Sequence, residues 1–104
     1  MKWILFTGTW RLTNSEVEAD VRTAAREVLE RGDGIVTGGA TGVDYFVIDE
    51  LKKIDPQFIK LKVFLPTSLE AYIEDYRNNW LHTPITIQDI DKLEVLLKEV
   101  RSTN

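Results

Sequence analysis

The chain has 104 residues, which suits one domain with a single core and leaves no room for a second domain. Hydrophobic residues make up 43% and charged residues 29% of it, proportions typical of a globular protein rather than a disordered or membrane chain. The formal net charge of -4 disfavours a dedicated nucleic-acid binder, and the absence of cysteine excludes disulfides, thiol catalysis and thiolate metal sites.

The N-terminus lacks the charged, apolar and small-residue sections of a signal peptide. The longest uncharged apolar stretch is also far too short to cross a bilayer. We therefore expect a cytoplasmic protein with no membrane partner.

A first strand is predicted over residues 2–7. The helix after it is opened by Thr13, Asn14 or Ser15, and Ser15 with Glu18 has the spacing of a capping box. Apolar residues recur in this helix at steps of three and four, so one stripe faces a core. They are Val17, Val21, Ala24, Ala25, Val28 and Leu29.

A glycine turn at residues 32–34 ends that helix and leads into a strand at 35–37. The next helix carries apolar residues from Val43 to Ile54 and is stopped by Asp55-Pro56. A third strand is predicted over 60–65, where lysine and phenylalanine alternate with leucine and valine, so one face is partly wet.

Residues 66–68 open a third helix, and Thr83-Pro84 breaks the chain after it. A last helix, capped by Thr86 with Asp89 three residues on, runs to about Val100. The alternation of strands and helices predicts an α/β fold with a short parallel sheet of about three strands and right-handed crossovers. Residues 1–104 form one domain.

The most informative segment runs from Gly34 to Asp44, where a short apolar strand breaks into a glycine-rich turn and then into a helical pattern. This layout leaves backbone N–H groups pointing at an anion. Upstream, the strand at 2–7 runs into Gly8-Thr9-Trp10-Arg11 and a second helix, so the arrangement occurs twice. Because ligands of parallel sheets lie beyond the carboxyl ends of the strands, we expect a nucleotide-sized cleft there, joined by residues 66–68.

The candidate ligand-binding residues are those of the two loops. They are Thr7, Gly8, Thr9, Arg11, Thr37, Gly38, Gly39, Ala40, Thr41, Gly42 and Asp44.

Each candidate also has a purely structural interpretation. The glycines allow a phosphate to approach the backbone, and one or more of them takes a positive φ, or they only shape a tight turn. Arg11 clamps a phosphate or carboxylate in a bidentate fork, or forms a surface ion pair. Asp44 holds a ribose hydroxyl, or accepts N–H bonds at its own helix start. The threonines donate to phosphate oxygens, or reflect β-propensity, and Trp10 stacks on a base or covers the core.

The other polar and aromatic residues give weaker indications. His82 is the only histidine and has no second ligand at metal spacing, so we expect a surface histidine and no metal site. Tyr72, Tyr76 and Trp80 form a helical stripe that is more typical of a core or interface than of a stacking platform. Three acidic residues are acid–base candidates by their charge alone: Glu70, Glu74 and Asp75.

Three segments together resemble the SLOG superfamily, the Rossmann-like group that contains the Smf/DprA, LOG lysine-decarboxylase-like and YpsA-related proteins. Residues 6–11 resemble its G-S-R loop, with Thr9 in the serine position and Trp10 inserted before Arg11. Residues 35–44 are close to its G-G-A-x-G-[IV]-D loop, and residues 65–72 resemble the YpsA-related branch. The resemblance covers residues 1–80 as a core, followed by a C-terminal helix at 84–101.

The resemblance implies a Rossmann-like three-layer fold and a nucleotide-like small molecule held by the glycine loops, with sensing or regulation ahead of turnover and no cofactor. The alternative is a LOG-type nucleotide N-glycosidase or phosphoribohydrolase; LOG enzymes share a P-G-G-x-G-T-x-x-E segment that this chain lacks. DprA-like binding of single-stranded DNA is disfavoured by the acidic charge balance. The family's usual second half is also missing, so the chain is a minimal member or the front part of a longer protein.

The resemblance also suggests the strand order three-two-one, which makes strands one and three the two edges. Lys60 and Lys62 protect strand three. Residues 3–6, however, form a continuous apolar run typical of strands buried on both faces. We therefore expect a homo-oligomer in which a second chain covers strand one and the apolar stripes of the later helices. The alternative order, two-one-three, makes strand one central and needs no partner.

Overall fold

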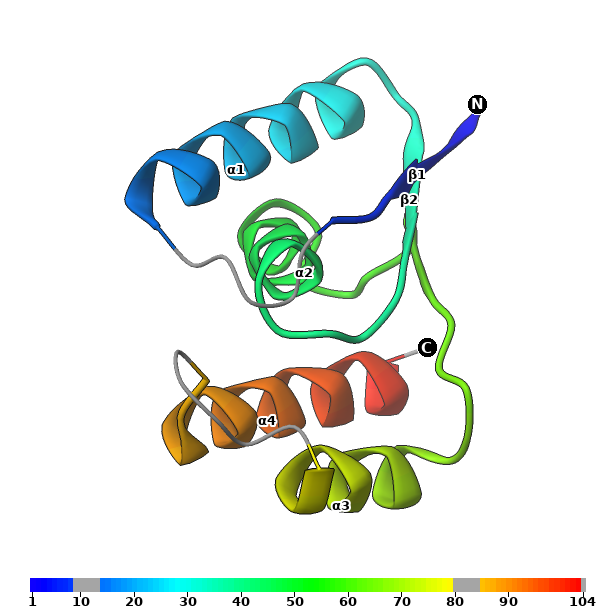
Figure 1. The fold of residues 1–104 in the computed structure, drawn as a ribbon. Coiled ribbons are helices and arrows are strands. Elements are labelled where there is room, and N and C mark those ends of the chain that lie inside the picture. Colours follow the sequence, from blue (N-terminus) through cyan, green and yellow to red (C-terminus); the bar gives the residue numbers. More distant parts are fainter. Residues whose placement is uncertain (9–13, 80–84, 104) are drawn as a thin grey trace.

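The computed structural model describes residues 1–8, 14–79 and 85–103, and Figure 1 shows their arrangement. The predicted alternation of strands and helices is present, with element ends that differ from the expected ones by at most three residues. The elements are β1 (Trp3–Phe6), α1 (Ser15–Glu30), β2 (Gly34–Thr37), α2 (Val43–Ile54), β3 (Leu61–Val63), α3 (Leu69–Asn79) and α4 (Ile87–Thr103).

The helix starts are set by short polar side chains. Asn14, and not a Ser15 capping box, opens α1: its side-chain oxygen accepts from the Val17 amide at 2.8 Å, which makes Ser15 the first helical residue. At α4 the predicted capping box is confirmed, since Thr86 and Asp89 each accept from the other's backbone N–H, at 3.2 and 2.9 Å.

The sheet is parallel, in the order β1-β2-β3, which confirms the order three-two-one and excludes two-one-three. Phe6 pairs with Thr37, and Thr37 pairs with Val63. The chain steps across the sheet twice in the same direction, and right-handed crossovers in one direction place their helices on one face. Accordingly α1 and α2 lie on the same face of the sheet, while α3 and α4 pack on each other below α2 in the view of Figure 1.

The core lies between that face of the sheet and the helices. Ile35 of β2 and Val47, Ile48 and Leu51 of α2 are fully buried. Ile90 and Leu93 of α4 are fully buried as well, so α4 extends the same core past α2. The predicted apolar stripes of these helices therefore do face a core.

The other face of the sheet is largely uncovered. Trp3 is 37% exposed, and Leu5 and Phe64 are each 67% exposed, whereas Ile4 and Phe6 are half-buried on the helix side. The alternation expected in β3 is present, with Leu61 buried and Lys62 exposed. The apolar run of β1 is thus not buried on both faces within the described chain.

The protein is α/β, with a three-stranded parallel sheet flanked by four helices in its described ranges, as predicted. This is consistent with a small Rossmann-like three-layer fold, although the two sides of the sheet are covered unequally. None of the helices in the described ranges is long and apolar enough to cross a membrane.

Candidate functional site

The carboxyl ends of β1 and β2 bring the two predicted loops together. Thr7 and Gly8 follow β1 and are exposed, and residues 38–42 follow β2. A Cβ added to Gly8 would lie 2.7 Å from Cγ2 of Val43, the first residue of α2. The backbone at Gly8 therefore packs directly against the first turn of the helix that follows the second loop.

A buried polar cluster lies at this strand end. The Thr37 hydroxyl lies 2.9 Å from the Phe6 carbonyl oxygen and 2.9 Å from Oδ1 of Asp44. Oδ2 of Asp44 accepts from the Ala40 amide at 3.3 Å. Thr37 is 1% and Asp44 8% exposed, so β1, β2 and the start of α2 are joined away from solvent.

Counting protons in this cluster indicates the state of Asp44. The Thr37 hydroxyl has one proton but touches two acceptor oxygens, so a protonated Asp44 would complete the chain by donating to Thr37 while Thr37 donates to Phe6. Burial raises the pKa of Asp44, and the hydrogen bonds from Thr37 and Ala40 oppose that rise. Both observations favour the neutral carboxyl more than usual for an aspartate.

The glycine loop is also held from α3. The Tyr76 hydroxyl accepts from the Thr41 amide at 3.0 Å and lies 3.3 Å from the Thr41 hydroxyl, with both residues buried. Tyr72 packs edge-to-face on Tyr76 at 5.4 Å between ring centroids, and burial raises its pKa. The aromatic stripe that includes Tyr72 and Tyr76 was expected to be core or interface. The hydrogen bond from the Thr41 amide to the Tyr76 hydroxyl was not predicted, although a buried tyrosine normally finds a hydrogen-bond partner.

The fold explains why two positions of the second loop are glycine. Gly42 precedes α2 with φ of 77°, a conformation that side chains other than glycine rarely adopt, as was expected of one or more of these positions. A Cβ on Gly39 would lie 2.5 Å from Cδ2 of Leu65 and 3.3 Å from Leu97. The loop therefore shapes a close turn whatever else it does.

The remaining candidates are placed as follows. Thr9, Arg11, Trp10, Trp80 and His82 lie outside the described residues. Two of the acidic candidates on α3 have partners: Glu70 pairs with Arg101 and Asp75 accepts from Asn79. Within the ranges that the structure describes, no three His, Cys, Asp or Glu side chains gather as a metal site would require.

A polar cleft of about 390 Å³ adjoins the glycine loop at Thr41. Arg22 lines it and is already matched by Glu18, Asp49 and Glu50, at 2.9, 2.9 and 3.2 Å. Charges of both signs surround this cleft, so it is not a dedicated anion site. Asp89, Lys92 and Tyr45 complete its polar lining.

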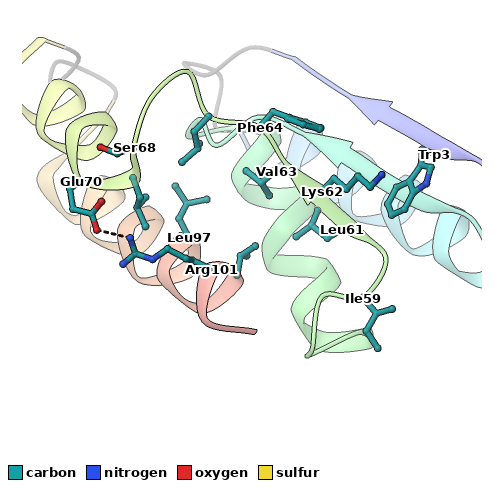
Figure 2. Close-up of a pocket in the computed structure, with 13 residues that line it drawn as sticks. Trp3, Ile59, Leu61, Lys62, Val63, Phe64, Ser68, Glu70, Leu97 and Arg101 are labelled. Atoms are coloured by element: carbon teal, nitrogen blue, oxygen red, sulfur yellow. Dashed lines mark hydrogen bonds and ion pairs between the residues drawn. The ribbon is translucent and has the colours of Figure 1, made fainter. Parts of the chain in front are cut away.

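A more spacious cleft, about 990 Å³, lies elsewhere, between β3 and helices α3 and α4 (Figure 2). Its lining is mostly apolar and includes Phe64 and Leu97, with the Glu70–Arg101 pair on one side. It follows β3, where the buried Leu61 and the exposed Lys62 and Phe64 all line it, and it is separate from the polar cleft at Thr41.

Comparison with family models, with curated proteins and with solved structures finds no match for this chain. Membership of the SLOG superfamily therefore rests on the sequence segments alone and stays a prediction.

Proposed function

We propose that the chain binds a nucleotide or nucleotide-derived phosphate ligand at the paired loops, in sensing or regulation. The observation that carries this proposal is the buried pair of Thr37 and Asp44, which are hydrogen-bonded to each other beside the exposed end of β1. A tight turn requires glycine but does not require a buried carboxyl, whose desolvation costs free energy. Groups that are costly to bury gather at functional sites more often than elsewhere.

The loop contacts indicate where a phosphate would bind. The Ala40 and Thr41 amides already donate to Asp44 and Tyr76. We therefore assign the anion to the exposed side of the site, formed by Thr7 and Gly8 with the half-buried Gly38. The twelve-residue helix α2 begins there and contributes its positive end. Arg11 would supply the counter-charge.

A LOG-type N-glycosidase is the alternative. Such a reaction needs a carboxylate that stabilises a cationic sugar. The aspartate beside the loops, Asp44, has both oxygens engaged inside the protein, which favours binding over turnover. We expect no release of free base from AMP above the uncatalysed rate. Release at an enzymatic rate that is lost in Asp44→Asn would reverse the order of the two proposals.

The binding proposal is tested by thermal shift with nucleoside phosphates, ADP-ribose derivatives and cyclic dinucleotides, because a ligand that binds the folded state raises the Tm. We expect at least one to do so, and Arg11→Ala to abolish the shift. The matched control is Arg31→Ala, which removes an exposed arginine paired with Asp33 near the opposite end of the sheet. Equal shifts in Arg11→Ala and in the wild type would remove Arg11 from the site.

Gly39→Val would be a poor test of the same site. Its added side chain would collide with Leu65 and Leu97 before meeting any ligand, so lost binding would report damaged packing.

A further inference from the structure

The uncovered side of the sheet is an apolar surface with a defined centre. We call Trp3, Leu5, Val36, Lys62 and Phe64 the open face; all five belong to β1, β2 and β3 or the residue after β3, at alternating positions. The Trp3 ring lies against Gly34, where a Cβ would come within 2.6 Å of it, and the Lys62 ammonium lies 4.3 Å from its centroid. Figure 2 shows Trp3, Lys62 and Phe64 along this side of the sheet.

The open face continues into the large cleft. Phe64, Lys62 and Trp3 line both, and beyond β3 the cleft is walled by Leu97 and Val100 of α4. Ile59, 71% exposed, lies at the same cleft. One surface thus carries the exposed Leu5 on its β1 side and, on its β3 side, a hollow edged by the exposed Phe64 and Ile59.

We propose that the open face and its cleft bind a second copy of this chain in a two-fold symmetric dimer. A two-fold axis parallel to the strands, between two open faces, places β1 of each copy opposite β3 of the other. Trp3 and Leu5 of one copy then lie over Phe64 and the cleft of its partner. The contact is repeated by symmetry, so each hollow receives the exposed side of the other copy.

The size of the surface suits such a partner. The exposed parts of Trp3, Leu5, Ile59 and Phe64 amount to on the order of 500 Å² of apolar surface, as large as the largest patch of a typical monomer. With the rim of the cleft added, each copy approaches the roughly 800 Å² per partner of a standard interface.

The charges on this surface also favour a second copy over a nucleic acid. Lys62 is the charged residue within the open face, and at the cleft Arg101 is paired with Glu70. A nucleic acid would require clustered positive charge, and the chain as a whole has a net charge of -4. A partner with an apolar centre and few charges matches the composition of this surface.

Sedimentation and light scattering of the whole chain test the proposal. We expect a mass near twice the 12.0 kDa of the chain at high micromolar concentration. Leu5→Glu and Phe64→Glu should each weaken the dimer at least tenfold, whereas Val95→Glu should not, because Val95 is 58% exposed on α4 and lines a different cleft. A wild-type monomer across the range, or a dimer indifferent to both changes, would overturn the proposal.

Cross-linking tests the geometry, since a chain without cysteine accepts single reporters cleanly. A short bismaleimide should join a mixture of the Leu5→Cys and Phe64→Cys variants into heterodimers, and should leave Val95→Cys monomeric. Preferential joining of Leu5→Cys to itself would instead indicate pairing of two β1 edges, which leaves the open face uncovered and contradicts the arrangement.

Discussion

The two ends of the sheet use aspartate in opposite ways. At the amino end Asp33 accepts from the Lys2 amide at 2.9 Å and pairs with Arg31 at 2.8 Å, near the surface. At the carboxyl end Asp44 also accepts from a backbone amide, but it is buried, and its hydrogen-bond partners among the described residues, Thr37 and the Ala40 amide, carry no charge. Both aspartates fix a loop, yet only the second is hidden from water.

The environments shift the two carboxyl groups in opposite directions. The hydrogen bonds from Arg31 and Lys2 lower the pKa of Asp33. Burial raises the pKa of Asp44 despite its hydrogen bonds. A partly exposed aspartate is enough to tie a turn, so the more deeply buried one at the carboxyl end calls for a further reason, and the proposed ligand binding at that end would supply it.

The largest expected effect is a loss of stability on substitution of Gly8, for which Gly34 is the comparison. A Cβ at Gly8 would meet three atoms of Val43, a stiff residue in the first turn of α2, within 3.1 Å. A Cβ at Gly34 would meet the Trp3 ring, which can swing into solvent. We expect Gly8→Ala to lower the free energy of unfolding by about 2 kcal/mol and Gly34→Ala by less than about 1 kcal/mol. Urea denaturation measures both, and equal losses would refute the close approach of Gly8 to α2.

A smaller effect is expected when Tyr76 loses its hydroxyl. Tyr76→Phe removes the acceptor that the buried Thr41 amide uses, which should cost about 1–2 kcal/mol of stability. Amide exchange at Thr41 should accelerate more than exchange at Ile35, whose amide bonds to Lys60 in the sheet. Unchanged exchange at Thr41 would show that α3 does not hold the loop.

The smallest expected effects are the changes in stability of Asp44→Asn and Asp33→Asn at neutral pH, which are opposite in sign. A raised folded-state pKa means that Asp44 favours folding when protonated and loses that contribution as pH rises through the folded-state pKa. Asp44→Asn stays neutral, donates to Thr37 and accepts from Ala40. It should therefore gain stability over the wild type as pH rises towards neutral, while weakening ligand binding.

Asp33→Asn should behave in the reverse way. Its lowered pKa contributes stability above the ordinary value of 3.8, and this is lost as pH falls through the folded-state pKa. The variant should be less stable than the wild type at neutral pH, and the difference should close in acid. Thermal melts from acid to neutral pH follow both variants, and parallel curves would contradict the contrast between the two ends.

Much of the fold could be predicted from the sequence because its signals are local. Periodic apolar residues and glycine breaks indicate the strands and helices, and the parallel order brings the two loops to one sheet end. The choice of Asn14 over Ser15 as the cap could not be predicted. Either side chain can accept a hydrogen bond from the backbone amide three residues further along the chain.

The features that could not be predicted depend on contacts between residues that are far apart in the sequence. Tyr76 reaches Thr41 across 35 residues, and its position in an apolar stripe gives no sign of its hydroxyl's partner. The run 3–6 reads as a strand buried on both faces, but burial depends on which helices cross the sheet, and α1 and α2 cross on the same side.

We propose that phosphate ligands bind at the carboxyl end of the sheet. The most direct measurement is an amide NMR titration of the whole chain with AMP and with ADP-ribose. We expect shifts at Gly8 and across Gly38 to Gly42, with the amino-end amides of Lys2, Gly34 and Lys60 unmoved. Saturable shifts gathered at the amino end or in the large cleft, or none with either ligand at millimolar concentration, would contradict it.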